Sequence, residues 1–365
     1  MSRIKKYLDV DVVTMAKDRL RHIYDIFDDI VVCFSGGKDS LATLHLTKQI
    51  AEERGAALPV KVLFRDQELI PQDVIDFVDE YRQQPWVRMY WFAVPLVSSK
   101  YILGKSVRYI QWDKDREHFR PMPDFAIRLD PNSTDWRAFG HDDFDTYAEQ
   151  FFHGKTAFVT GIRASESLMR YRSVVNKLHE NYICESGARN IMLCKPIYDW
   201  MENDIFKFFH DQQIRYCPCY DSQWLAQKPL RVASPFQCEA AKTLKYERAI
   251  HPDFFDRLMR MFPEMEIQWR YYEELDFSGL VARYGQSLDG VAAYIVETIN
   301  DEDERKKAFQ MLAECKKLNR LNPKAYPIEN VFNHIRRGGF RKMIMPIPVA
   351  QQEQMERRKA KELKA

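Results

Sequence analysis

The stretch that decides the fold runs from Ile30 to Ser40 and reads Ile-Val-Val-Cys-Phe-Ser-Gly-Gly-Lys-Asp-Ser. Its opening run, Ile30–Phe34, is apolar, largely β-branched and too short for a helix, which is typical of a buried parallel strand. Two glycines interrupt the pattern, and residues 39–53 then resume a helical spacing of apolar side chains. The stretch therefore predicts a strand, a sharp turn and the beginning of a helix.

The turn between this strand and helix has the composition of a phosphate-binding loop. Glycine lets the backbone turn sharply and brings its N–H groups close to a bound anion. The N-terminus of the following helix adds unpaired donors and a favourable dipole, while lysine adds a mobile positive charge and serine adds hydroxyl donors. An ordinary serine-capped turn is the alternative. The agreement of loop and context favours a phosphate site made by Ser35, Gly36, Gly37, Lys38, Asp39 and Ser40.

Strands and helices alternate outward from this loop. Short β-branched or aromatic runs predict further strands at 60–64, 89–94 and 156–160. Apolar residues at helical spacing predict helices at 11–27 and 199–210, and another beginning at Pro71. Because such an alternation requires right-handed crossovers, it predicts an α/β fold with a doubly wound, mostly parallel sheet.

Two regions depart from the alternation. Residues 96–150 mix aromatic with basic side chains, and we interpret them as an insertion beside the active site. The chain is helical and charged in pattern beyond about residue 225. We therefore predict one domain at 1–225, which carries the insertion, and a helical C-terminal region at 226–365 that ends in a basic tail. The insertion and the tail are candidate nucleic-acid contacts, although a solvated basic helix is the favoured interpretation of the tail.

A second candidate motif follows the strand predicted at 156–160. Gly161 comes directly after that strand, so the turn allows a close backbone approach to a ligand. Arg163, Arg170 and Arg172 lie within ten residues of one another, and guanidinium groups suit phosphate or sulfate oxygens. A solvated helix in which Glu166 pairs with Arg170 is the alternative.

These motifs resemble those of a known superfamily. The loop is not a Walker loop and resembles the PP-loop of the N-type ATP pyrophosphatases, the adenine nucleotide alpha hydrolase superfamily. The segment 160–172 resembles the Gly-x-Arg-x-x-Glu-Ser-x-x-Arg stretch of its branch containing the phosphoadenosine phosphosulfate (PAPS) reductases and the ATP sulfurylase small subunit. Residues 195–205 and 214–221 resemble that branch's Pro-Leu-x-x-Trp helix and Asn-Pro-Leu-Tyr-Asp segment. Trp200 and Asp204, one helical turn apart, are expected to serve packing.

The resemblance, which covers about residues 20–222, implies an ATP-binding domain of the PP-loop, Rossmann-like type. In that superfamily the loop grips the β,γ-pyrophosphate and exposes the α-phosphate to attack. It therefore implies ATP and Mg²⁺ as cofactors and an adenylyl transferase or pyrophosphatase from which pyrophosphate leaves. Carried over to this chain, the catalytic residues are Lys38, Arg163, Arg170 and Arg172.

The sequence differs from that branch at several positions, and these differences narrow the activities that the resemblance implies. The C-terminal cysteine nucleophile of the PAPS reductases is missing, which disfavours reduction of PAPS. The segment 63–68 replaces the usual Asp-Thr-Gly-Tyr strand end, and with the insertion and C-terminal region it makes the chain most similar to the IbrA-type regulators. Phe64, Arg65 and Asp66 are candidate nucleotide contacts. Asp66 or Glu68 could instead bind magnesium or serve only as turn residues.

Composition and cysteine usage place the protein in a broad class. An apolar fraction of 45% and a charged fraction of 30% are those of a soluble globular protein. With no signal peptide or membrane span in the pattern, we predict a cytoplasmic protein that does not contact membranes. Seven cysteines without framework spacing predict free thiols. Cys217-Pro-Cys219, with Cys194 and Cys238, suggests a metal site, but its one-residue gap favours buried thiols and we predict no metal ligand.

Three functional hypotheses remain open at this point. The first is an ATP-dependent adenylyl transferase or pyrophosphatase with an unknown acceptor, for which sulfate is one candidate. The second is sulfur modification of tRNA or DNA, which draws on the insertion at 96–150. The third is a nucleotide-sensing regulatory protein that binds ATP or a related adenine nucleotide without fast turnover and acts with a protein partner. We favour the first.

Overall fold

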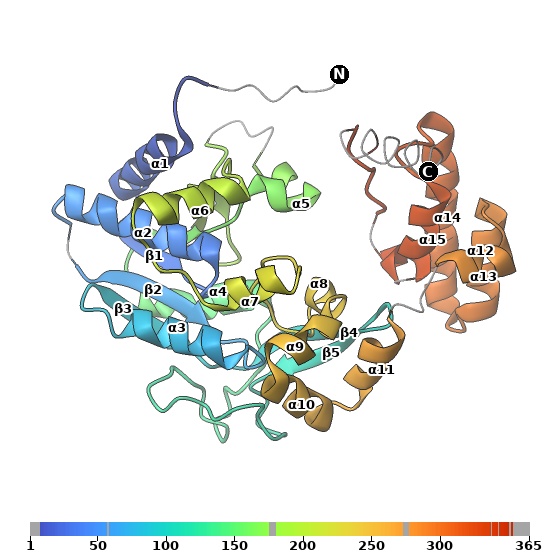
Figure 1. The fold of residues 1–365 in the computed structure, drawn as a ribbon, viewed down its shortest axis with the longest axis horizontal. Helices are drawn as coiled ribbons and strands as arrows, with labels where there is room; N and C mark the ends of the chain where they lie inside the picture. Colours follow the sequence, from blue (N-terminus) through green and yellow to red (C-terminus); the bar gives the residue numbers. More distant parts are fainter. Residues whose placement is uncertain are drawn as a thin grey trace. The chain divides into compact units, whose positions relative to one another are not determined.

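A computed structural model of the chain is drawn in Figure 1. It describes residues 8–56, 58–174, 180–272, 277–336, 338–341, 343–349 and 352. The chain divides into two compact units. The larger contains Tyr7–Lys100 and Arg108–Pro263, and the smaller contains Tyr101–Val107 and Glu264–Ala365. The boundary predicted at residue 225 stays a prediction.

The larger unit is built on a six-stranded sheet in the order β3-β2-β1-β6-β8-β7. Every neighbouring pair is parallel except β7 and β8, which are antiparallel at one edge. The predicted α/β fold with a doubly wound, mostly parallel sheet is confirmed. The strands are β1 (Asp29–Cys33), β2 (Val60–Arg65), β3 (Val87–Phe92), β6 (Thr156–Thr160), β7 (Ile183–Glu185) and β8 (Ile191–Cys194).

Alternate side chains of the central strands enter two separate apolar cores, one on each face of the sheet. Val32 and Phe64 pack into the larger core, while Val31 and Leu63 pack into the smaller one. The smaller core is covered by α4 (His141–Ala148). The larger core is covered by α1 (Val12–Ile26), α2 (Lys38–Glu53), α3 (Gln72–Arg82), α6 (Glu202–Asp211) and α7 (Cys219–Leu225).

Two predicted boundaries differ from the structure for local reasons. The strand predicted at 89–94 is β3 and ends at Phe92, because the N–H group of Ala93 donates to the carbonyl of Ile127 and leaves the ladder. The helix predicted at 199–210 begins only at Glu202. Its start is fixed by the backbone of Met201, which donates to the Asp204 carboxylate over 2.6 Å.

The insertion at 96–150 contains regular structure that its composition did not predict. Strands β4 (Leu96–Ile102) and β5 (Lys105–Gln111) form a two-stranded sheet. Further along, isolated bridges join Ile127 to Phe92 and Phe139 to Leu96. The insertion is therefore hydrogen-bonded to the chain at the end of β3.

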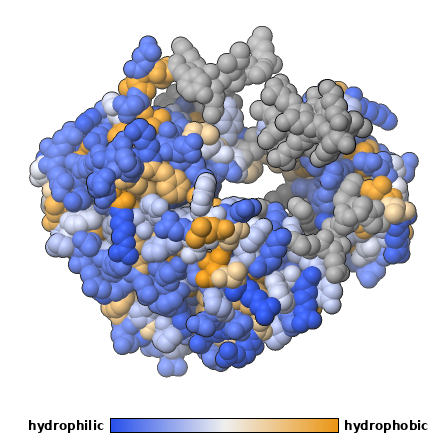
Figure 2. All heavy atoms as spheres, viewed as in Figure 1, coloured by the Kyte–Doolittle hydropathy of each residue, from blue (hydrophilic) through white to orange (hydrophobic). Residues whose placement is uncertain are grey.

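Short helices follow α7 and complete the larger unit. They are α8 (Cys238–Ala241), α9 (Glu247–Ile250) and α10 (Pro252–Met261). On the face shown in Figure 2, polar residues predominate and apolar ones lie in small groups. Among the described residues, no helix has both the length and the apolar character needed to cross a membrane.

Apart from Tyr101–Val107, which belong to β4, β5 and the turn between them, the described part of the smaller unit is helical, as predicted for the C-terminal region. Its helices are α11 (Glu264–Tyr271), α12 (Phe277–Tyr284), α13 (Leu288–Thr298), α14 (Glu302–Leu321) and α15 (Ile328–Arg336). Helices α13, α14 and α15 share a core that includes Ile295, Leu312 and Phe332. Most of the basic tail predicted from Arg336 onward lies outside the described residues.

A half-buried histidine links α2 to α3 and makes stability depend on pH. His45 Nε2 lies 2.8 Å from the hydroxyl of Tyr81, and burial lowers the pKa of His45 to about 4. Because the unfolded chain binds this proton near its ordinary value, the free energy of unfolding should fall by about 2 kcal/mol as pH falls from about 6.5 to about 4. Denaturant titrations of wild type and His45→Gln across this range measure the loss.

The slope between about pH 6.5 and 4 should be smaller in His45→Gln than in wild type. The exposed His210 serves as the control, because His210→Gln should retain the wild-type slope. Equal slopes in wild type and His45→Gln would contradict the assignment of this pH dependence to His45.

Candidate functional site

The loop predicted to bind phosphate lies at the centre of the sheet. It follows β1, which pairs with β2 on one side and with β6 on the other. The chain order reverses between β1 and β6, because β2 and β3 extend in one direction and β8 extends in the other. In open α/β sheets this switch point leaves a crevice at the carboxyl ends of the strands, where ligands bind.

The two loop glycines are required by different constraints. Gly36 has φ +75°, and a Cβ there would lie 2.9 Å from a methyl group of Val78. Gly37 caps α2 in an extended conformation, and a Cβ there would lie 3.3 Å from the hydroxyl of Tyr220. The backbone of the turn lies so close to neighbouring segments that a side chain at either position would be crowded.

Several backbone donors of the loop are already paired, and others are not. Ser35 N donates to Ser40 Oγ over 3.1 Å, and Lys38 N donates to the hydroxyl of Tyr220 over 2.8 Å. The N–H groups of Gly36, Asp39 and Ser40 have no hydrogen-bond partner among the described residues. Unpaired donors at the first turn of a helix are the groups that bind phosphate oxygens in proteins.

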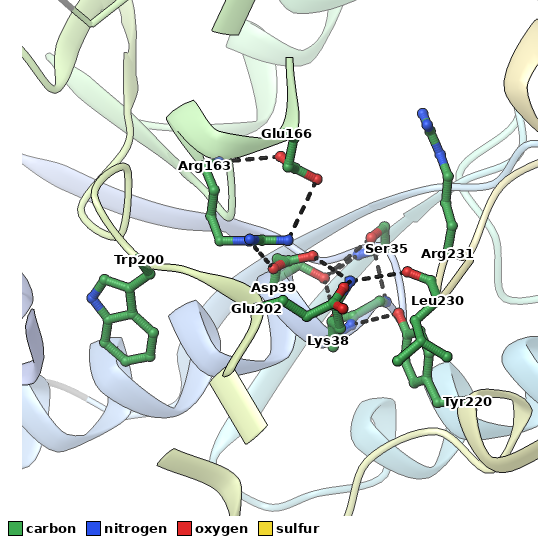
Figure 3. Close-up of polar contacts among 12 residues, drawn as sticks. Ser35, Lys38, Asp39, Arg163, Glu166, Trp200, Glu202, Tyr220, Leu230 and Arg231 are labelled. Carbon is green, nitrogen blue, oxygen red and sulfur yellow. Dashed lines mark hydrogen bonds and ion pairs between the residues drawn. The ribbon is translucent and has the colours of Figure 1, made fainter. Parts of the chain in front are cut away.

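The ammonium group of Lys38 is held among oxygen atoms (Figure 3). It donates to the carbonyl of Leu230 over 3.0 Å and lies 3.3 Å from carboxylate oxygens of both Asp39 and Glu202. The side chain is only 4% exposed. The geometry therefore gives the loop a buried positive charge with protein counter-charges, which an anionic ligand would have to replace.

Gly161 lies directly against the backbone of α2, and its predicted contact with a ligand stays a prediction. A Cβ at this position would lie 2.5 Å from the carbonyl carbon of Asp39 and 2.6 Å from the nitrogen of Ser40. The turn after β6 thus packs directly on the first turn of α2. This packing lets Arg163 Nε reach Asp39 Oδ1 over 2.5 Å, and Arg163 is almost fully buried.

The arginines predicted for the site differ in their positions. Arg170, on α5 (Leu168–Arg172), pairs with Glu166, whose carboxylate also accepts from the backbone of Arg163. This pair is the alternative that the sequence left open. Burial and the neighbouring Arg231 lower the pKa of Arg170. Arg172 is exposed at the C-terminal end of α5.

The side chains of two candidate nucleotide contacts at the end of β2 are packed against other side chains of the protein. Phe64 is buried and packs against Trp91, with ring centroids 4.5 Å apart. The guanidinium of Arg65 lies over the ring of Phe144 and 3.7 Å from a carboxylate oxygen of Asp145. The register of β1 and β2 ends at Leu63, and the nucleotide contacts of Phe64 and Arg65 stay predictions.

The carboxylates of Asp66 and Glu68 are fully buried and saturated with donors. Asp66 accepts from Trp91 Nε1 over 2.8 Å and pairs with Arg120. Glu68 accepts from the backbone nitrogens of Trp112 and Phe119 over 2.7 Å each, and pairs with Arg116. All of these donors except Trp91 belong to the insertion. Of the alternatives left open, this arrangement favours a structural role over magnesium binding.

Three residues near the loop were not among the predicted site residues. They are Tyr220, Glu202 and Gln223, and the last accepts from Arg231 N and donates to Arg231 O over 2.9 Å each. Burial raises the pKa of Tyr220 well above its ordinary value, so its hydroxyl is neutral when it accepts from Lys38 N. The motif at 214–221 contained a signal for Tyr220, whereas nothing in the sequence pairs Glu202 with Lys38.

The motif residues expected to serve packing do so. Trp200 is fully buried, and its Nε1 donates to the carbonyl of Val12 over 3.0 Å. Asp199 forms a two-pronged pair with Arg19 at 2.8 and 2.7 Å. Together with the Asp204 cap, these contacts fix α1 and α6, and so position Glu202 beside the loop.

Fold and site together define an α/β protein of the adenine nucleotide alpha hydrolase-like class. The family model of the phosphoadenosine phosphosulfate reductase domain matches residues 29–109 and 146–262, which is more than half of the chain. The protein belongs to this family. The gap between the two matched segments falls inside the insertion.

Among curated proteins, the chain is similar to the uncharacterized protein YbdN of Escherichia coli strain K12. The two are 28% identical over 270 residues, which is 69% of this chain, and the similarity spans only 66% of the length of YbdN. Among solved structures, it is similar to FMN adenylyltransferase of Candida glabrata in complex with ATP, with a TM-score of 0.38, 15% identity and coverage of 60% of this chain and 62% of that chain.

A second solved structure is the PAPS reductase of Candida auris in a phosphate complex. Its TM-score is 0.34 at 10% identity, with 63% of this chain and 97% of that chain covered. Likenesses at this level carry no information on the activity of this protein.

The close packing at Gly161 predicts a strong effect of an added methyl group. Gly161→Ala should lower the free energy of unfolding by about 2 kcal/mol or more, because the methyl meets rigid backbone of α2. Gly55→Ala is the matched control, since a Cβ there has open space and meets only the cost of a positive φ, about 1 kcal/mol. Urea titrations measure both, and an equal loss in the two variants would contradict the packing argument.

Proposed function

We propose that this protein is an ATP-dependent adenylyl transferase or pyrophosphatase that cleaves between the α- and β-phosphates. The observation that carries the proposal is the loop at the switch point, where the N–H groups of Gly36, Asp39 and Ser40 lack partners among the described residues and Lys38 lies beside them. Donors of this kind suit the pyrophosphate portion of a nucleotide. Membership of the PAPS reductase family supports an adenine nucleotide as the ligand.

Each residue of the loop has a role in this proposal. The unpaired N–H groups and the hydroxyls of Ser35 and Ser40 hold the pyrophosphate, and Lys38 exchanges its contact with Glu202 for phosphate oxygens. Arg163 is held by Asp39, and Arg170 lies near it, so both can neutralise charge that builds on the α-phosphate. Arg172 is exposed and is proposed to approach the acceptor. Mg²⁺ accompanies the triphosphate and neutralises its charge.

The acceptor is open to experiment. Sulfate is one candidate, because the chain resembles the ATP sulfurylase small subunit, and an anionic acceptor fits the arginines beside the loop. A cytoplasmic location is part of this proposal. The IbrA-type resemblance adds a protein partner as a further expectation.

A second candidate, nucleic-acid sulfur modification, is favoured by a cavity of about 640 Å³ in the insertion. Its lining includes Trp112, Lys114, His118, Arg128 and Trp136. Ala93, which directly follows β3, also lines it. The ammonium of Lys114 lies 4.8 Å from the ring centroid of Trp136. Aromatic surfaces with adjacent cations are the means by which proteins bind single-stranded bases.

A third candidate is a nucleotide-sensing regulator without fast turnover. The pairing of Lys38 with Asp39, Glu202 and the Leu230 carbonyl supports it, because a loop whose lysine is already satisfied needs a conformational change before it acts. Tight ATP binding without pyrophosphate release would favour this candidate over the first.

The main proposal predicts that pyrophosphate release from ATP and Mg²⁺ depends on Lys38. Lys38→Ala should lower release by about 100-fold, since one charged donor to the leaving group is lost. Lys207→Ala is the control, because it removes the same charge from an exposed position on α6. Release is measured with and without sulfate and tRNA, so that the additive that raises it identifies the acceptor class. Equal release by wild type and Lys38→Ala would contradict the proposal.

The second candidate predicts that the insertion binds single strands. Trp136→Ala should weaken binding of a fluorescently labelled single-stranded RNA about tenfold, because one stacking surface is lost. The exposed Trp224, which lies on α7, provides the control variant Trp224→Ala with wild-type affinity. Fluorescence anisotropy measures the affinities, and unchanged binding by Trp136→Ala would exclude this cavity as the site.

A further inference from the structure

Two cysteines and an aspartate converge beside α3. The thiol sulfurs of Cys217 and Cys219 and a carboxylate oxygen of Asp73 all lie within 4.8 Å of one another. Both cysteines are fully buried, and Asp73 is in the first turn of α3. We propose that these three residues bind a thiophilic divalent cation, zinc.

The local backbone explains how so short a cysteine spacing can serve one ion. Pro218 has helical φ and ψ angles and is the N-cap of α7, which Cys219 begins. The chain therefore turns between the two cysteines and places both thiols on one side. The one-residue gap, which in the sequence favoured buried thiols without a metal, does not prevent the thiols from converging. Cys194 and Cys238 are not part of this group.

The surroundings are those that a metal site requires. His251 Nε2 lies 3.1 Å from Asp73 Oδ2, and His251 Nδ1 lies 2.9 Å from Glu247 Oε2. A chain of carboxylate, imidazole and carboxylate fixes the orientation of a ligand, as outer-shell partners do in metalloproteins. His251 is thus a positioning residue that fixes the Asp73 carboxylate.

The charges around the three residues partly offset one another. Two thiolates, one carboxylate and Zn²⁺ leave one net negative charge, and binding releases the two thiol protons to solvent. The buried ammonium of Lys228 lies near Cys219 and also pairs with Glu247, so it is shared between the two. In the absence of an ion, the hydrogen bond with Cys217 and burial raise the pKa of the Cys219 thiol.

A cavity beside Cys219 leaves room for water or another small molecule as a fourth ligand. This cavity has a volume of about 180 Å³, and Lys228, Glu247 and His251 also line it. Three protein ligands and one exchangeable position are the arrangement of reactive zinc centres, whereas purely structural ones have four protein ligands.

Cobalt substitution of the full-length protein tests the site. The reduced protein is stripped with a chelator and titrated with Co²⁺, and we expect about one ion per chain, a thiolate-to-cobalt charge-transfer band and displacement by zinc. A double variant, Cys217→Ala with Cys219→Ala, should lose the band. Cys315→Ala, which removes a buried thiol elsewhere, should retain it.

A further variant keeps the test valid if the double variant does not fold, as judged by circular dichroism. His251→Gln retains all three ligands and should keep the band while weakening cobalt affinity about 10–100-fold. Absence of the band in wild type, or its persistence in a folded double variant, would overturn the proposal. An iron–sulfur cluster in the isolated protein would also overturn it. None of these readouts depends on ATP, so the proposal stands or falls independently of the proposed function.

Discussion

The structure depends on one close contact, the packing of the turn after β6 against the first turn of α2. At Gly161 there is no room for a side chain, since a Cβ would lie 2.5 Å from the backbone of Asp39. The contact joins the segments that follow β1 and β6, the two strands at the switch point. It therefore fixes the position of Arg163 relative to the backbone donors of the loop. A bulkier residue would separate the two halves of the site, although neither half would lose a residue of its own.

The lysine of the loop, Lys38, is held by residues from distant parts of the chain. Three residues from far along the chain contact Lys38: Glu202, Tyr220 and Leu230, which lie 164, 182 and 192 residues after it. Gln223 holds the backbone of Arg231 and so fixes the neighbouring Leu230 carbonyl. The site is therefore completed by the C-terminal part of the larger unit, and the sheet alone would leave Lys38 exposed.

The sequence was informative where chemistry is local. The strand, turn and helix around Gly36 and Gly37 follow from apolar runs and glycines, and the packing role of Trp200 follows from helical spacing. It was silent where partners come from distant segments, as for Glu202 with Lys38 or Asp73 with Cys217. No periodicity encodes which carboxylate faces which cation, because that depends on how helices are placed after folding.

The buried carboxylates at the end of β2 couple this strand to the insertion. Asp66 and Glu68 have their counter-charges, Arg120 and Arg116, in the insertion, and a buried charge that loses its partner costs about 3–5 kcal/mol. The end of β2 and the insertion therefore depend on each other for stability. A relative that lacks the arginines should also lack the acids, and a chimera that exchanges the insertion must carry the end of β2 with it.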